Sequence, residues 1–366
     1  MRGEFSELDG TERLDRLRLA RADGVGPITF RRLIAKYGSA EAAISAPPQR
    51  NAARRFTPPS RDDARAEIDA VEDLGARLVV IGEPDYPERL TEIADPPPAL
   101  IAFGDLALAR RRIIAIVGAR NASSAGLAMA RRLAEGFGEA DVVVASGLAR
   151  GVDGAAHQAS LATGAIAVVA GGADVIYPPE HRDLQREIAR RGLLLSERPL
   201  GARPTGRDFP RRNRIVSGLS EAVVVVEASA RSGTLITARL AGEQGRDVFA
   251  VPGSPLDKRS EGANRLIQEG AGLAASADDV LSAIGRAELR PAPLSLFDAF
   301  EEETEDAPTD LLNAVRDRLS HLPAHPDPLA RDLGATSSAV AAALVELVLI
   351  GEAVEEAGGY ALAVSA

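Results

Sequence analysis

The stretch from Ile113 to Leu133, with the sequence IIAIVGARNASSAGLAMARRL, decides the fold of this chain. Its first five residues are all apolar, which predicts a strand buried on both faces of a sheet. A glycine-containing loop, 118–123, comes next, and apolar residues at helical spacing over 127–137 predict a helix after it. Strand, loop and helix in this order form the repeating unit of an α/β fold.

The same unit recurs from about residue 76 onward. Further helical patterns, at 155–162 and 235–244, fall between the apolar runs. This alternation predicts an α/β fold with an extended Rossmann-like, doubly wound, mostly parallel sheet, in which ligands bind outside the carboxyl ends of the strands. The apolar runs predict strands at 78–81, 100–103, 113–117, 142–146, 165–170, 193–196, 222–227 and 248–251.

Two smaller modules flank this central domain, which is expected to span 76–287. Residues 1–60 predict a small helical domain of the SAM or helix-hairpin-helix type, with a proline-rich linker at 47–63. Within it, Gly24-Val25-Gly26-Pro27 is either a tight turn, which the shortness of the pattern favours, or a hairpin that presents backbone N–H groups to phosphate.

Residues 308–366 predict a winged-helix-like domain. Its three helices are expected at 311–319, 328–333 and 337–349, and a short hairpin at 352–363. The third helix carries Glu346 and no basic residue, which favours a structural or protein-binding role over DNA recognition.

The net charge of −10 is concentrated in one segment. The expected linker 288–307 and its border hold seven acids between Asp298 and Asp310, with no basic residue among them, so the rest of the chain carries only −3. An acidic balance of this origin does not argue against a polyanionic ligand.

Other compositional features exclude whole classes of chemistry. The chain has no cysteine, so disulfides and thiolate catalysis are excluded, and its four histidines lack any familiar metal spacing. We therefore expect no metal and no cofactor. The charged first residues and the short apolar runs predict a cytoplasmic protein with no membrane partner.

Glycine loops follow four of the predicted strands, and parallel strands bring such loops to one edge of a sheet. Backbone N–H groups there can bind an anion. Helix capping is the alternative role for Ser123, Asp153, Ser232 and Thr234, while Tyr177 either stacks on a base or packs in its loop. The residues expected at the anion site are Gly118, Arg120, Ser123, Gly147, Arg150, Gly151, Ser232, Gly233 and Thr234.

A basic and aromatic stretch, Phe209-Pro210-Arg211-Arg212-Asn213-Arg214, stands out in this acidic chain. Guanidinium groups match phosphate geometry, and an exposed ring offers a face on which a base can stack. We expect this stretch to form the basic wall of the cleft.

Several familiar catalytic motifs are missing. There is no GxxxxGK[ST] loop and no GxGxxG with its acidic partner, which argues against ATP hydrolysis of that type and against NAD use. No Ser-His-Asp set or carboxylate pair stands out. The sequence therefore predicts a binding protein that is not an enzyme.

Taken together, the motifs over residues 76–285 resemble the DNA-processing protein A family, DprA, also called Smf. The resemblance is carried by Tyr86-Pro87-Glu88-Arg89-Leu90, Val117-Gly118-Ala119-Arg120, Ser146-Gly147-Leu148-Ala149-Arg150-Gly151-Val152-Asp153 with Ala156-His157, Tyr177-Pro178, Ser196-Glu197, Phe209 to Arg214, Ser232 to Ala238 and Val251-Pro252-Gly253.

The resemblance implies a non-catalytic protein that binds and protects single-stranded DNA. Family members help to load the RecA recombinase onto that strand during natural transformation and DNA recombination, displacing or bypassing single-strand-binding protein, and they form homodimers. Arg120 matches the family's phosphate-contacting arginine, and Phe209 its aromatic contact to a base. One arginine among Arg211, Arg212 and Arg214 is expected to be structural, pairing with an acid such as Glu197 or Glu227.

Two other functions remain as alternatives. Residues 231–236 echo the Gly-Thr part of a motif found in Rossmann-like nucleotide phosphoribohydrolases, but the glutamate expected shortly after it is absent. A pure interaction scaffold, in which the glycine loops are only turns, predicts no affinity for DNA at physiological salt.

Overall fold

The computed structural model describes residues 8–46, 56–288 and 309–362, the last range with gaps at 321–323, 338, 341–342, 345–346, 348–351 and 357–358. The chain divides into two compact units. The first holds residues 1–49 and 54–290, and the second holds 50–53 and 291–366. Almost all of the predicted acidic linker lies outside the described residues.

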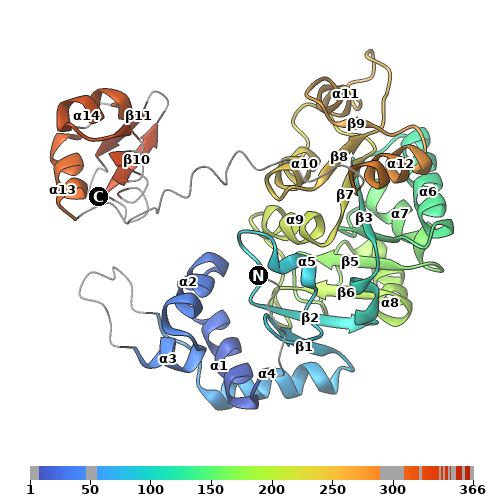
Figure 1. The fold of residues 1–366 in the computed structure, drawn as a ribbon. Coiled ribbons are helices and arrows are strands. Elements are labelled where there is room, and N and C mark those ends of the chain that lie inside the picture. Colours follow the sequence, from blue (N-terminus) through green and yellow to red (C-terminus); the bar gives the residue numbers. More distant parts are fainter. Residues whose placement is uncertain are drawn as a thin grey trace. The chain divides into compact units, whose positions relative to one another are not determined.

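A nine-stranded sheet forms the centre of the described part of the first unit (Figure 1). The strand order is β1-β2-β6-β5-β4-β3-β7-β8-β9. From β6 to β9 along this order the neighbours are parallel, whereas β2 is antiparallel to both β1 and β6. The strands are Arg77–Val80, Ala99–Gly104, Ile113–Val117, Val143–Ser146, Ala165–Val169, Leu193–Ser196, Ala222–Val225, Asp247–Ala250 and Gly272–Leu273, β1 to β9.

The predicted fold class is confirmed, and all eight predicted strands are present. The sequence analysis missed β9, because a strand of two residues has no periodicity to detect. Every residue of β3 and of β5 is buried, as their continuous apolar runs predict.

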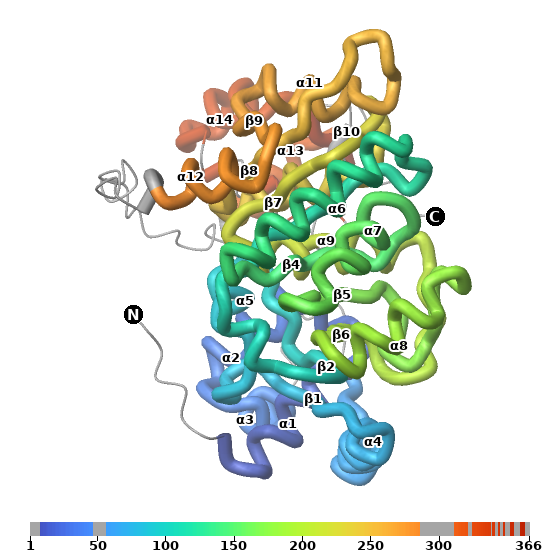
Figure 2. The backbone as a smooth tube through the Cα atoms, turned by 90° about the vertical axis from the view of Figure 1, so that its right-hand side faces the viewer, coloured from blue at the N-terminus to red at the C-terminus, as the bar shows by residue number. Residues whose placement is uncertain are grey.

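Helices cover both faces of the sheet (Figures 1 and 2). One face packs against α5 (Glu88–Thr91), α9 (Asp208–Leu219), α10 (Thr234–Glu243) and α11 (Glu261–Gln268). The other face packs against α6 (Ser124–Glu139), α7 (Val152–Ser160), α8 (Arg182–Arg191) and α12 (Ala277–Glu288). Successive residues of β3 enter opposite clusters, since side chains along a strand alternate between faces.

The arginine-rich stretch, for which the sequence analysis predicted no secondary structure, is the beginning of α9. Pro210 is tolerated there because the N–H groups of a first helical turn have no partner inside the helix.

The N-terminal helices are α1 (Gly10–Arg21), α2 (Pro27–Tyr37), α3 (Ala40–Ser45) and α4 (Arg61–Asp73). The expected linker at 47–63 is wrong at its C-terminal end, because Ser60 and Asp63 form a capping box that starts α4. Ile68 and Val71 of α4 pack with Leu14 and Leu17 of α1 in one cluster. The helical module is therefore packed onto the sheet within one unit.

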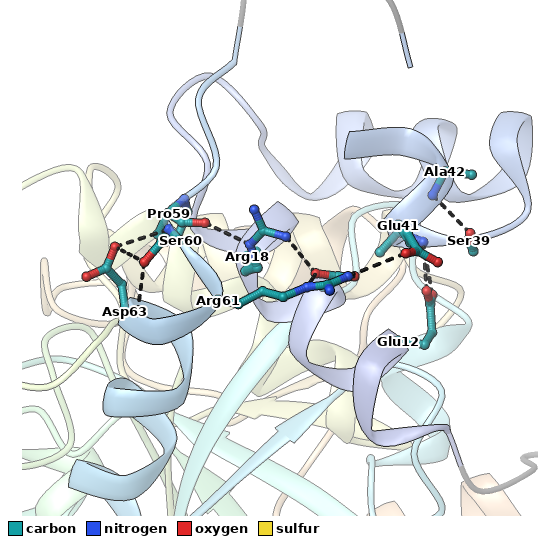
Figure 3. Close-up of polar contacts among 11 residues, drawn as sticks. Glu12, Arg18, Ser39, Glu41, Ala42, Pro59, Ser60, Arg61 and Asp63 are labelled. Atoms are coloured by element: carbon teal, nitrogen blue, oxygen red, sulfur yellow. Dashed lines mark hydrogen bonds and ion pairs between the residues drawn. The ribbon is translucent and has the colours of Figure 1, made fainter. Parts of the chain in front are cut away.

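A buried carboxylate ties these helices together. Asp15 of α1 is fully buried, and it accepts hydrogen bonds from Arg18 at 2.7 Å and from Arg61 at 2.6 and 3.1 Å. Arg18 also donates to the carbonyl of Pro59 (Figure 3). Burial raises the pKa of Asp15, but the hydrogen bonds and charges of Arg61 and Arg18 outweigh burial and hold that pKa below its ordinary value.

The second unit contains α13 (Thr309–Arg318), α14 (Pro326–Leu333) and an antiparallel hairpin of β10 (Ala353–Glu356) and β11 (Gly359–Leu362). The described residues between 337 and 347 are helical, as the sequence predicts for the third helix. Val315, Leu329, Leu344 and Ala353 pack in one core. Together these elements match the predicted winged-helix pattern.

Candidate functional site

Four neighbouring strands, in the order β5-β4-β3-β7, end at one edge of the sheet and are followed by the predicted loops. The loop after β3 and the loop after β4 approach so closely that only glycine fits at one point. Gly151 has φ +77°, and a Cβ there would collide with the carbonyl oxygen of Ala119. Thr234 adds a hydrogen bond of 3.0 Å from its hydroxyl to the carbonyl of Gly118. The loops therefore form one cross-tied surface.

A cavity of about 510 Å³, the central pocket, opens between these loops and α9. Numbered along the chain, the four glycine loops are 118–123 after β3, 146–153 after β4, 171–172 after β5 and 232–234 after β7. The lining of the central pocket includes the first, second and fourth of these loops together with the start of the arginine-rich helix. Among the predicted site residues, the central pocket is lined by Gly118, Arg120, Gly147, Phe209, Arg212, Asn213, Ser232, Gly233 and Thr234.

Residues of the arginine-rich stretch lie on two different sides of α9. Residues three and four apart share a face of a helix, so Phe209, Asn213 and Val216 face the central pocket. Arg211 and Arg214, also three apart, line a different cavity next to the N-terminal helices. The single basic wall that the sequence analysis expected is thus divided between two cavities.

Phe209 contacts both a cation and a second aromatic ring. The guanidinium carbon of Arg120 is 5.1 Å from the centre of the Phe209 ring, and the ring of Tyr177 is 5.4 Å from it, centre to centre. Arg120 is exposed, and Tyr177 is 43% exposed. A smaller side pocket of about 250 Å³, lined by all three residues and by Arg150, adjoins the central pocket.

Arg212 lies beneath the loops and is only 7% exposed. Its Nη1 donates to the carbonyls of Gly147 and Val168, at the ends of β4 and β5. Burial lowers its pKa to about 10, and Asp153 opposes that shift. The Asp153 carboxylate accepts the N–H groups of Gly147 and Ala149 at 3.2 Å. Arg212 therefore fixes the shape of the second glycine loop.

Arg214 is a second buried structural arginine, where the sequence analysis expected one in this stretch, and it is the one that pairs with acids. Its Nη2 lies 2.5 Å from Glu197, and its Nε lies 3.2 Å from Asp95. The predicted pairing with an acid is confirmed with Glu197. Glu227, the other acid considered, instead accepts the N–H of Ser123 at 2.9 Å and the Ser123 hydroxyl.

The remaining predicted residues differ in their availability. Ser123 caps α6 by accepting the N–H of Gly126 at 2.9 Å, so its hydroxyl has both a donor and an acceptor partner inside the protein. Arg150 is exposed and lies 3.7 Å from Glu180, a weak ion pair that a ligand can replace.

The sequence analysis missed Arg259, an exposed cation that lines the central pocket. Arg259 follows β8 by way of the Pro252-Gly253-Ser254 turn. That turn lies at the carboxyl end of a parallel strand, which is the sequence feature that could have identified Arg259 as a site residue. Asp257 pairs with Arg259 at 2.8 Å.

His157 is fully buried in α7, and neither of its ring nitrogens has a hydrogen-bond partner among the described residues. Burial is the largest cause that lowers its pKa to about 3, followed by the charges of His181 and Arg212. The nearby backbone of Ser146 raises the pKa and offsets only part of this shift. Because the folded protein binds this proton less tightly than the unfolded chain, stability is lost as pH falls from about 6.5 toward 3.

We expect His157→Leu to make the free energy of unfolding less dependent on pH in the acid range. Between pH 6 and 4 the parent should lose up to about 1.4 kcal/mol per pH unit from this residue, and the variant should not. Urea unfolding at several pH values measures the difference. A pH profile parallel to that of the parent would contradict the expected effect.

Within the described residues, no group of three or more histidine, aspartate or glutamate side chains is arranged to hold a metal ion. No helix in that part of the chain has the length and apolar character needed to cross a membrane.

Three family models match the chain in succession. Residues 77–285 match DNA recombination-mediator protein A, residues 10–70 match the DprA-like N-terminal HHH domain, and residues 301–359 match the DprA winged helix domain. The first match covers the sheet and every residue of the central pocket.

Individual proteins agree with these matches. A DNA processing protein DprA from Streptococcus pneumoniae is 47% identical over 199 residues, which are 54% of this chain and 70% of the relative. The X-ray structure of DprA from the same species aligns with a TM-score of 0.61 at 35% identity, covering 76% of this chain and 98% of that one. A Helicobacter pylori DprA structure, described as showing a single-stranded DNA binding mode, aligns with a TM-score of 0.54 at 28% identity over 58% and 96% of the two chains.

Proposed function

Since the chain belongs to the DNA recombination-mediator protein A family, DprA/Smf, we propose that it binds single-stranded DNA across the central pocket without chemical conversion of the strand. The observation that carries this proposal is the contact between Arg120 and Phe209 at the mouth of the glycine loops. A phosphate-binding cation and a base-stacking ring lie side by side there, as binding of a single strand requires.

Arg120 is the movable part of this arrangement. It is exposed, and it makes a cation–π contact with Phe209, worth about 0.5–1 kcal/mol at an exposed site. A base that stacks on Phe209 contributes about 1–3 kcal/mol. We therefore propose that Arg120 turns from the ring to a phosphate when a base takes its place.

The second contact region is the edge of the glycine loops. Gly118 and the segment from Ser232 to Thr234 line the central pocket, where the backbone can approach a phosphate closely. We add Arg150 and Arg259 as exposed cations on either side. Phosphates and ring faces do not identify a base, so the sequence preference of binding is expected to be weak.

A non-catalytic role is supported by the contacts of the acidic residue in the central pocket, which is not free to act on a substrate. Among the described residues that line the central pocket, Asp153 is the single carboxylate. Burial raises its pKa, and the N–H groups of the second glycine loop occupy it. A nucleotide phosphoribohydrolase needs a carboxylate free to act on its substrate. No contact in the pocket favours that alternative.

Further parts of the proposal rest on the family alone. We propose that the protein acts in the cytoplasm as a homodimer and protects incoming single strands. It would then load the RecA recombinase onto those strands in competition with single-strand-binding protein.

Fluorescence anisotropy of a labelled single-stranded oligonucleotide, titrated at several salt concentrations, tests the binding function. The plot of log K against log salt should have a slope of about −0.7 per phosphate contacted. A duplex of equal length should bind more weakly, because its bases cannot reach Phe209. Equal affinity for both, or no affinity for either, would overturn the proposal and make release of free base from nucleoside monophosphates the next assay.

A further inference from the structure

Two neighbouring loops supply walls of the side pocket. Leu148 to Arg150, in the second glycine loop, form the first wall. Tyr177 to Glu180, between β5 and α8, form the second wall. His181 follows the second wall directly and precedes α8, and its side chain is half-buried. None of the sequence motifs described above includes this histidine.

A hydrogen bond from His181 joins the two walls. Its Nδ1 lies 3.1 Å from the carbonyl oxygen of Leu148. A carbonyl oxygen only accepts, so Nδ1 carries a proton and donates it whether the ring is neutral or charged. Arg150 and Glu180 also join the walls, but an ion pair of 3.7 Å between exposed side chains contributes little. His181 is therefore the firmer connection.

The carbonyl that His181 holds belongs to a residue in an unusual conformation. Leu148 is 1% exposed and has a φ of +55°, in the left-handed region that residues other than glycine seldom adopt. Such backbone persists only where its surroundings hold it in place. Asp153 accepts the N–H groups on both sides of Leu148, those of Gly147 and Ala149, and His181 donates to its carbonyl.

A glycine in α7 makes room for the His181 ring. Gly154 lies in the first turn of that helix, although glycine is among the poorest helix formers. A Cβ built at Gly154 would lie 2.6 Å from Cε1 and 2.8 Å from Nε2 of His181. The ring thus packs against the backbone of α7, and this contact fixes the direction in which Nδ1 points.

We propose that His181 is a positioning residue of the DNA site. It fixes the second wall to the first, and so holds Tyr177 at 5.4 Å from Phe209, the ring on which a base stacks in the proposed function. The His181 ring is engaged with Leu148 and Gly154, so it acts through Tyr177 rather than by touching the strand. This inference rests on the proposed function.

Substitutions of His181 test the connection between the walls. His181→Leu removes the donor, and we expect it to weaken binding of a labelled oligothymidylate about threefold to tenfold, as loss of one hydrogen bond implies. In His181→Asn the amide nitrogen takes the place of Nδ1, so affinity should stay within about twofold of the parent. Anisotropy measures affinity, and urea unfolding checks that both variants fold. Equal losses in the two variants would overturn the proposal.

A double-mutant cycle separates positioning from a general structural role. Tyr177→Ala removes the neighbour of the Phe209 ring and should weaken binding about threefold to tenfold. Adding His181→Leu to Tyr177→Ala should then cost no more than about a further twofold. Two losses that multiply would show that His181 does not act through Tyr177. Binding by Tyr177→Ala as tight as that of the parent would overturn the proposal in the same way.

Gly154→Ala displaces the His181 ring without removing its donor. We expect it to weaken binding about as much as His181→Leu does. Asparagine lacks the two ring atoms that the new Cβ would meet, so Gly154→Ala combined with His181→Asn should restore affinity to within about twofold of the parent. A loss that persists in the combined variant would contradict the role of the ring contact.

The positioning role and the proposed function fail in different ways. If the parent binds single strands and His181→Leu binds them equally well, the positioning role is overturned and the central pocket stands. If the parent binds no single strand, the proposed function itself fails.

Discussion

Arg120→Glu is expected to weaken single-stranded DNA binding about 30-fold to 150-fold. The change removes a charge-assisted hydrogen bond to phosphate, worth about 1.5–3 kcal/mol, and adds a repulsive charge in its place. Stability should stay within about 1 kcal/mol of the parent, because Arg120 is exposed, makes no ion pair within the described residues and loses only its cation–π contact with Phe209. Anisotropy titration at one salt concentration measures the loss, and urea unfolding measures the stability.

Arg131→Glu is the matched control. Arg131 is an exposed residue of α6 outside the lining of both pockets, so its reversal changes the net charge of the protein by the same amount. A loss of affinity equal to that of Arg120→Glu would mean that overall charge, rather than the central pocket, governs binding.

Arg212→Met is expected to have the largest effect on stability, a loss of about 3–5 kcal/mol. The substitution removes the donor to the carbonyls of Gly147 and Val168 and leaves Asp153 buried without its cationic neighbour. Urea unfolding measures this loss. Arg150→Met, at an exposed arginine with a 3.7 Å ion pair, should change the free energy of unfolding by less than about 1 kcal/mol.

The pH dependence of this loss has a definite sign. Burial already raises the pKa of Asp153, and removal of Arg212 raises it further. The folded variant then binds a proton more tightly than the unfolded chain, so its deficit shrinks as pH falls and grows as pH rises through the raised pKa. A deficit that does not change with pH would show that the lost hydrogen bonds, not Asp153, account for the instability.

Much of the fold could be predicted from local patterns. The continuous apolar runs at 113–117 and 165–170 gave strands buried on both faces, since a parallel sheet covered by helices leaves no polar side to either strand. The gathering of the glycine loops followed from parallel strand direction alone. The helix at Asp208–Leu219 was not foreseen, because arginines and a proline obscure its apolar face.

The site was less predictable than the fold. Six neighbouring residues, Phe209 to Arg214, looked alike as a basic stretch, yet they have three different roles. Phe209, Pro210 and Asn213 line the central pocket, Arg211 lines the cavity next to the N-terminal helices, and Arg212 and Arg214 are buried structural cations. The role of each residue depends on which other element packs against that side of α9. Those elements are distant in the sequence, so the local pattern does not predict the roles.

The sequence by itself determined the sheet, the edge at which its loops gather and the kinds of side chain available there, since these follow from short-range periodicity and composition. Only the tertiary structure decided which arginines remain free for a ligand. A guanidinium that is enclosed by carbonyls or carboxylates, such as Arg212 or Arg214, is held in place by those groups. Arg120 stays available because its neighbour is the ring of Phe209, a partner weak enough for a phosphate to replace.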